Sequence, residues 1–119
     1  SRKTLPYKYS KEDTIFNVSH SSLLTAAFIS ENWEMLRVAS LDTVHQSYRM
    51  KQMPELFEVQ KIALKSGALM STLSGSGSTM FNIVYSRESK KLEDALKKKF
   101  PHFRVFTCPF DNNGVKIEI

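Results

Sequence analysis

The sequence predicts an α+β domain of the ferredoxin-like, split βαβ kind, in which helices cover one face of an antiparallel sheet and extra helices fill the first crossover. The order of patterns along the chain is strand, helices, strand, strand, helix, strand, with one further strand at the end. The length of 119 residues suits one small domain, and 41% hydrophobic and 24% charged residues are close to globular averages. We therefore expect residues 1–119 to form a single domain.

The first half of the chain is predicted to hold one short strand and four helices. Residues 4–9 alternate as a strand does, and Ser10 with the acidic residues behind it matches the capping box that opens a helix. Pro54 and Gly67 mark the beginning and the end of a later helix. The predicted helices cover residues 11–29, 33–39, 41–50 and 54–66. The apolar side of the last of these is formed by Leu56, Val59 and Ala63.

The second half is predicted to begin with a hairpin. Two alternating segments, residues 69–74 and 79–85, flank a short turn rich in glycine and serine. The elements predicted after the hairpin are a helix over residues 88–99 and strands over residues 103–108 and 115–119. Cys108, the single cysteine, lies in an apolar pattern, so we expect a small core residue rather than a nucleophile. One cysteine also excludes a disulfide framework and a cysteine-based zinc site.

The net charge of +5 comes mainly from residues 86–104, which hold seven basic and three acidic side chains. The lysines fall on the outer side of the predicted helix, and lysines near a helix C-terminus are favoured by its dipole. The strand over residues 79–85 lacks the basic and aromatic pattern of an RNA-binding sheet. We therefore expect a solvated helix face and no nucleic-acid partner.

Membrane association is not expected either. The longest apolar run, residues 23–29, is far shorter than the ~20 residues that a bilayer-spanning helix needs. No basic segment followed by an apolar one opens the chain, as it would in a signal peptide. Together with the single cysteine, these features favour a reducing, cytoplasmic setting.

One predicted helix gathers polar groups on one side. At about 100° of rotation per residue, four polar residues fall within an arc of roughly 100°: Asp42, His45, Gln46 and Arg49. An arginine fork holds a carboxylate by two parallel hydrogen bonds, so this face suits an anionic ligand. Spacing alone equally allows an ordinary solvated face with an internal ion pair. Both interpretations stay open.

A second candidate is the turn over residues 74–79, with the sequence SGSGST, which we call the glycine turn. Gly75 and Gly77 permit positive φ and let a ligand approach the bare backbone. The segment is neither a Walker sequence nor a GxGxxG before a helix, so a plain flexible connection is the alternative. The three histidines show no metal-ligand spacing, and we expect no metal site in this chain: His20, His45 and His102.

Taken in order, several segments resemble homoserine kinase, a family of the GHMP kinase superfamily. Residues 41–49, LDTVHQSYR, are similar to its D-x-x-H-x-x-x-R segment, and residues 73–81, LSGSGSTMF, are similar to its third motif. The resemblance extends to RKTLP at residues 2–6, IFN at 15–17, PEL at 54–56 and GAL at 67–69. It departs from the family pattern at three serines, where alanine or proline is usual: Ser47, Ser76 and Ser78.

The resemblance implies an activity and the residues that serve it. Homoserine kinase transfers a phosphoryl group from ATP to L-homoserine, giving O-phospho-L-homoserine for threonine biosynthesis. By resemblance, the substrate-binding residues are Arg2, His45, Arg49 and Gly75, and the glycine loop comprises Ser74, Gly75, Ser76 and Gly77. The family's phosphate loop and magnesium-holding acidic residue do not occur here, so ATP and Mg²⁺ are expected to bind mainly to an N-terminal domain absent from this chain.

We therefore expect the chain to be a GHMP kinase C-terminal domain, with no catalytic residue of its own and no activity alone. Its binding partners would be L-homoserine and ATP within the complete kinase. The alternative is a free-standing ferredoxin-like module that binds a small metabolite or regulates another protein. A homodimer is an arrangement that the sequence neither requires nor excludes.

Overall fold

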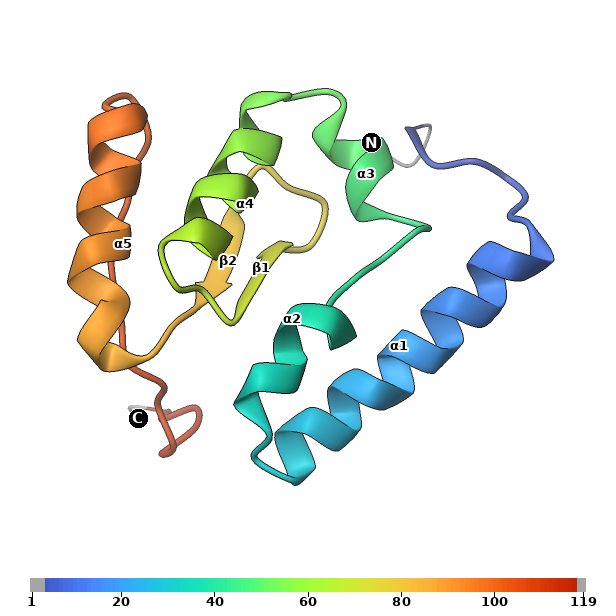
Figure 1. Ribbon diagram of the computed structural model, residues 1–119, viewed down its shortest axis with the longest axis horizontal. Coiled ribbons are helices and arrows are strands. Elements are labelled where there is room, and N and C mark those ends of the chain that lie inside the picture. The colour runs from blue at the N-terminus through green and yellow to red at the C-terminus, as the bar shows by residue number, and fades with distance from the viewer. Residues whose placement is uncertain (1–3, 118–119) are drawn as a thin grey trace.

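The residues that the computed structural model describes, 4–117, form helices around a two-stranded antiparallel sheet, and the predicted α+β class is confirmed. The first half of the chain supplies α1 (Lys11–Ile29), the 3-10 helix η2 (Trp33–Met35), α2 (Leu36–Ala39), α3 (Gln46–Met50) and α4 (Glu55–Lys65). The second half supplies β1 (Met70–Leu73), β2 (Met80–Ile83) and α5 (Ser86–Lys99). Figure 1 shows α4 lying across the strand pair, with α5 beside α4 and with α1 and α2 on the side away from α5.

The helix α1 begins where the capping signal predicts. The Ser10 hydroxyl oxygen accepts a hydrogen bond from the Asp13 N–H at 2.9 Å, and acidic residues in the first turn suit the positive end of the helix. Ala27 is its buried residue and packs in a cluster with Leu36 of α2, while Ile29 is 83% exposed. Neither α1 nor any other described helix is both long enough and apolar enough to span a membrane.

The helices α4 and α5 bury the faces that their apolar periodicity predicts. The buried residues are Leu56, Val59 and Ala63 of α4 and Leu92 and Leu96 of α5. Members of both sets meet in one core cluster, which joins the two helices. The helix α4 ends just before Gly67, whose φ of +98° is the left-handed conformation that glycine adopts at helix ends.

The strands β1 and β2 form the predicted hairpin. Leu73 pairs with Met80 at the last position of the ladder. Beyond this pair, the Ser74 N–H donates a hydrogen bond to the Thr79 carbonyl at 2.8 Å, which closes the ladder at the glycine turn. The turn lies on the side of the hairpin that faces α3 (Figure 1).

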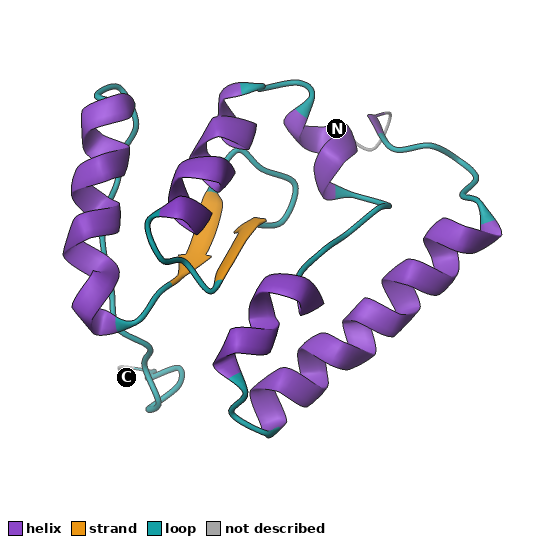
Figure 2. Cartoon of the chain, in the orientation of Figure 1, coloured by secondary structure: helices purple, strands orange, loops and turns teal. Residues whose placement is uncertain are grey.

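Three predicted strands are wrong. Residues 4–9 and 103–108 are not in strands, and neither are residues 115–117, the described part of the last predicted strand. Figure 2 shows these segments as loops. Local alternation favours extended backbone, but a strand also needs a neighbouring strand, and the sheet of the described residues consists of β1 and β2. The sheet is therefore smaller than the predicted split βαβ sheet.

Residues 103–108, which follow α5, are held by side-chain contacts instead of by strand pairing. Phe103 and Val105 pack against the core cluster of α4 and α5. The Thr107 hydroxyl donates a hydrogen bond to a Glu93 carboxylate oxygen at 2.6 Å. Cys108 is an exposed free cysteine, so the prediction of a small core residue is wrong. Without a ladder to place it against the sheet, this part of the chain leaves its thiol on the surface.

Candidate functional site

Arg49 is a buried charged residue in the segment of residues 41–50, for which the sequence predicts a polar face. It lies in α3, only 8% of its surface is exposed, and its Nε has no hydrogen-bond partner among the described residues. None of the ion pairs within residues 4–117 includes it. A buried N–H group without a hydrogen-bond partner is costly, and a ligand that supplies an anionic oxygen can remove that cost. Arg49 is thus the strongest candidate for an anion-binding side chain in the described part of the chain.

The helix α3 is shorter than predicted, and Asp42 has a different role. The expected helix over residues 41–50 starts only at Gln46, so the single polar face predicted for it is wrong. The aspartate carboxylate instead accepts hydrogen bonds from the N–H groups of Val44 at 2.9 Å, His45 at 3.1 Å and Gln46. The physical reason is that an acidic side chain satisfies the free N–H groups at a helix N-terminus better than it suits a helix interior.

Asn17 ties this segment to α1. Its side-chain N–H donates to Asp42 Oδ1 at 2.9 Å, and its carbonyl oxygen accepts from the Thr43 N–H, also at 2.9 Å. Burial by itself would raise the pKa of Asp42, but hydrogen bonds from three backbone N–H groups and from Asn17 hold that pKa below its ordinary value. The carboxylate is therefore ionised and fixed at neutral pH. No periodicity marks this role of Asn17, because only the fold brings α1 against the segment.

Gln46 links α3 to the strand that enters the glycine turn. Its Oε1 accepts a hydrogen bond from the Leu73 N–H at 3.0 Å, and its Nε2 donates to the Ser40 carbonyl at 3.3 Å. Met50, the last residue of α3, packs with Leu73 in a buried cluster. Both ends of α3 therefore contact Leu73. The helix that carries Arg49 is thus held against the start of the turn.

The glycine turn combines an open position with a crowded one. All four residues of the predicted glycine loop, 74–77, are exposed, and Gly75 and Gly77 have φ values of +56° and +89°. A Cβ at Gly75 would meet nothing within 4 Å, whereas one at Gly77 would come 3.2 Å from a methyl carbon of Leu73. Gly75 therefore leaves bare backbone open to a ligand, while Gly77 lets the turn pack on the core.

His45 and Arg2 complete the set of predicted site residues. His45 directly precedes α3, and its carbonyl accepts a hydrogen bond from the Arg49 N–H at 3.2 Å, so the two residues lie one helical turn apart. The imidazole is half-buried. Arg2 lies outside the described residues. The structure thus brings His45, Arg49 and the start of the glycine turn into one region, through the contacts of α3.

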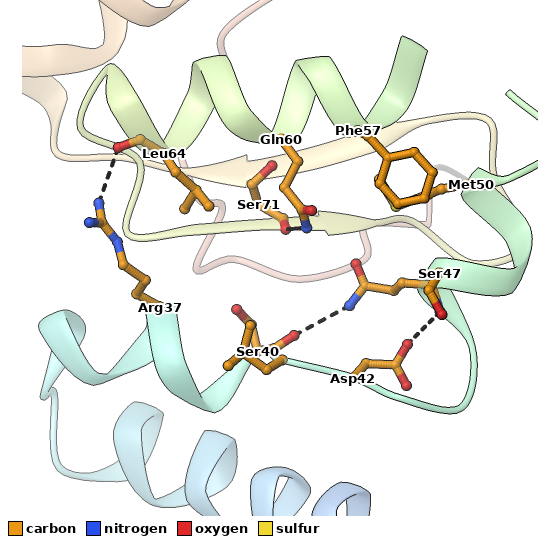
Figure 3. Close-up of a pocket in the computed structure, with 11 residues that line it drawn as sticks. Arg37, Ser40, Asp42, Ser47, Met50, Phe57, Gln60, Leu64 and Ser71 are labelled. Carbon is orange, nitrogen blue, oxygen red and sulfur yellow. Dashed lines mark hydrogen bonds between the residues drawn. The ribbon is translucent and has the colours of Figure 1, made fainter. Parts of the chain in front are cut away.

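A cavity of about 160 Å³ is lined by residues of α2, α3, α4 and β1 and of the segment between α2 and α3. Figure 3 shows Arg37 at one end of it, where the guanidinium donates to the Leu64 carbonyl at 3.2 Å. Gln60 donates to the Ser71 carbonyl at 2.8 Å, and the buried Ser71 hydroxyl has no hydrogen-bond partner within residues 4–117. Arg49 is not among the lining residues. Because the charged side chains here are held by bonds within the protein, this cavity is a weaker candidate than Arg49.

The described residues contain no cluster of metal-binding side chains. Within residues 4–117, no three His, Cys, Asp or Glu side chains are grouped so that they could hold a metal ion. Magnesium on ATP is commonly held by one or two carboxylates, and the carboxylate nearest to α3, that of Asp42, is engaged by backbone N–H groups. The glycine turn contains no charged side chain to pair with phosphates. The chemistry that these residues support is the binding and orientation of an anionic small molecule.

Comparison with known proteins agrees with the arrangement of helices and hairpin. The family model described as GHMP kinases C terminal matches residues 24–102. The chain is 78% identical over 119 residues to homoserine kinase of Aliarcobacter butzleri, covering 100% of this chain and 41% of the relative. It is 56% identical over 115 residues to homoserine kinase of Sulfurovum sp., covering 97% of this chain and 39% of the relative.

A solved structure gives the same result at the level of the fold. The crystal structure of homoserine kinase from Cytophaga hutchinsonii matches with a TM-score of 0.78 and 25% identity, over 84% of this chain and 32% of that one. The chain spans about two fifths of the length of the curated relatives it matches. The matched model covers well over half of the chain, and the chain belongs to the family of GHMP kinase C-terminal domains.

Proposed function

We propose that this chain forms the homoserine-binding C-terminal domain of an ATP-dependent homoserine kinase, which converts L-homoserine to O-phospho-L-homoserine for threonine biosynthesis. The observation that carries the proposal is Arg49, a residue only 8% exposed whose buried Nε has no partner among the described residues. The names of the relatives and of the matching solved structure support the same activity. Because the chain spans about two fifths of those relatives, the activity belongs to the longer protein.

Arg49 would hold the carboxylate of homoserine. The substrate carries a carboxylate, an ammonium and the hydroxyl that accepts the phosphoryl group, so a grip on the carboxylate fixes the direction of the hydroxyl. A guanidinium offers a planar fork of donors that matches a carboxylate, and its charge is retained at every physiological pH. The arginine needs an anionic partner, and the substrate supplies one.

The glycine turn and His45 would lie around the same substrate. Gly75 has room for a ligand beside its backbone, and His45 stands one helical turn from Arg49. We assign Gly75 to close contact with the substrate and His45 to a polar contact on the flank of Arg49. Arg2 is proposed as a second carboxylate-binding arginine, on the family resemblance alone.

ATP and Mg²⁺ would bind in the part of the full-length kinase that lies outside these residues. The described residues group no metal-binding side chains, and the glycine turn carries no charge. Phosphoryl transfer depends on positioned phosphates and a metal ion, so this domain would position the acceptor while the rest of the enzyme positions the donor. The setting we propose is the cytoplasm, where exposed Cys108 stays reduced.

Steady-state kinetics of the full-length kinase test the proposal. Arg49→Leu should raise the KM for homoserine by roughly ten- to a hundredfold, because a hydrogen bond to a charged group contributes about 1.5–3 kcal/mol. The KM for ATP should stay within about twofold. Arg37→Leu is the matched control, because Arg37 is an exposed arginine that already donates to backbone carbonyls. Equal changes for both substrates, or for both variants, would overturn the proposal.

A further inference from the structure

Two glutamines cover the outer edge of β1. The Ser74 N–H donates to the Thr79 carbonyl, so the backbone polar groups of residue 74 point toward β2. Because these groups alternate in direction along an antiparallel strand, those of residues 71 and 73 point away from β2. The outward N–H of Leu73 donates to Gln46 Oε1 at 3.0 Å. The outward carbonyl of Ser71 accepts from Gln60 Nε2 at 2.8 Å. Each glutamine thus joins one helix to the same strand edge.

The two glutamines differ in the helix that they hold. Gln60 lies within the 11-residue α4, which is also fixed by buried Leu56, Val59 and Ala63. Gln46 begins α3, a helix of five residues. A helix this short has almost no stability of its own, so contacts at its ends determine where it lies.

The amide of Gln46 is used at both of its polar atoms. Its Oε1 accepts from the Leu73 N–H, and its Nε2 donates to the Ser40 carbonyl at 3.3 Å. Glutamate cannot donate to that carbonyl and would add a second carboxylate beside Asp42, whereas methionine has a similar length without either hydrogen bond. The residue type therefore matches the two partners that the fold presents.

We propose that Gln46 is a positioning residue for the homoserine site, which holds the helix of Arg49 in register with the glycine turn. This inference rests on the proposed function, because it takes Arg49 as the carboxylate-binding group. The hydrogen bond from the Leu73 N–H to Gln46 Oε1 fixes the start of α3 against the residue that immediately precedes the turn. The contact of Arg49 with the substrate carboxylate and the position of the substrate hydroxyl beside Gly75 are then both set by the connection through Gln46.

The test compares Gln46→Met with Gln60→Met in the full-length kinase. Both changes remove a glutamine that bonds to the β1 edge, so both should lower the midpoint of thermal unfolding by similar, small amounts. Gln46→Met should raise the KM for homoserine about tenfold, because a misplacement of about 1 Å can cost as much as about 10²-fold. The KM for ATP should stay within about twofold, and Gln60→Met should change neither constant by more than about twofold. An equal effect of both variants on homoserine would overturn the inference.

A double-mutant cycle separates this inference from the proposed function. In the Arg49→Leu background, Gln46→Met should add less than about twofold to the KM for homoserine, because the group that it positions is gone. A full additional penalty there would overturn the role of Gln46 while leaving that of Arg49 intact. If Arg49→Leu alone leaves homoserine use unchanged, the proposed function fails first. Should Gln46→Met fail to fold, Gln46→Glu retains the acceptor for Leu73, loses the donor to Ser40 and should give a penalty of the same selectivity; a penalty on ATP as well would overturn the inference.

Discussion

Asn17 and Asp42 are joined by a hydrogen bond of 2.9 Å that connects the middle of α1 to the N-terminal end of α3. The same carboxylate accepts the backbone N–H groups that open α3, so one side chain serves both the helix cap and the connection to α1. Ala27 is the buried residue of α1, near the far end of that helix. The bond between Asn17 and Asp42 therefore attaches the first half of α1 to the rest of the fold, and apolar packing attaches the second half.

The pKa of Asp42 predicts how stability depends on pH. Burial opposes ionisation, but the hydrogen bonds to Asp42 hold its folded pKa below the ordinary value near 3.8. A lowered folded pKa gives a stabilisation that is fully present above the unfolded pKa and is lost as the pH falls through the folded pKa. In the full-length kinase, Asp42→Asn should lower the thermal midpoint at pH 7 and flatten its fall on acidification below about pH 4.

The control for this experiment is Asp94→Asn, a change at an exposed carboxylate on α5 that pairs with Lys90. Exposed pairs of this kind contribute only about 0–1 kcal/mol, so its midpoint should follow the wild type at every pH. If Asp42→Asn and wild type lose stability in parallel on acidification, Asp42 is not held ionised by the bonds to Asn17 and α3.

The two glycines of the turn predict a separation of activity from stability. Valine is strained at both positions, because both have positive φ, so this cost is shared and cancels in the comparison. A side chain at Gly75 enters open space, whereas one at Gly77 approaches Leu73 to 3.2 Å. Gly75→Val should therefore reduce kcat/KM for homoserine far more than Gly77→Val does at an equal loss of thermal midpoint. If activity and midpoint fall in step for both variants, the turn is only structural.

The 119-residue chain by itself should not phosphorylate homoserine. Among the described residues, no three His, Cys, Asp or Glu side chains are grouped as a metal site, and an ATP-dependent transfer needs bound phosphates and magnesium. The measurement is ATP-dependent formation of phosphohomoserine by the purified chain, free of the full-length enzyme, beside an equal amount of that enzyme. Turnover above background would contradict the division of the activity between two parts. Homoserine binding by the chain without turnover would agree with that division, because this part is proposed to hold the acceptor.

Local signals predict the parts of the fold that depend on neighbours in sequence. The Ser10 cap, the apolar side of α4 and the positive φ of Gly67 are such cases, because each depends on residues within one helical turn. The strand predicted over residues 103–108 fails because pairing requires a partner far along the chain, which alternation does not specify.

The candidate site shows the same division. Arg49 is found from its residue type and from the family resemblance, but its burial follows from packing that the sequence does not display. Asp42 is placed on a helix face by spacing, although aspartate is also a residue that satisfies free N–H groups at a helix start, as it does here. The bond from Leu73 to Gln46 joins residues 27 positions apart and has no local signal at all.

A substrate without the carboxylate gives the sharpest test of Arg49. The analogue 3-amino-1-propanol keeps the ammonium and the reacting hydroxyl of homoserine and lacks the group that Arg49 would hold. Wild-type kinase should use it poorly, by roughly ten- to a hundredfold in kcat/KM, because the charge-assisted hydrogen bond is worth about 1.5–3 kcal/mol. Arg49→Leu should cost a similar factor with homoserine but less than about threefold with the analogue, since the bond is already absent there. An equal penalty on both substrates would place Arg49 outside the carboxylate site, as a support of the fold around α3.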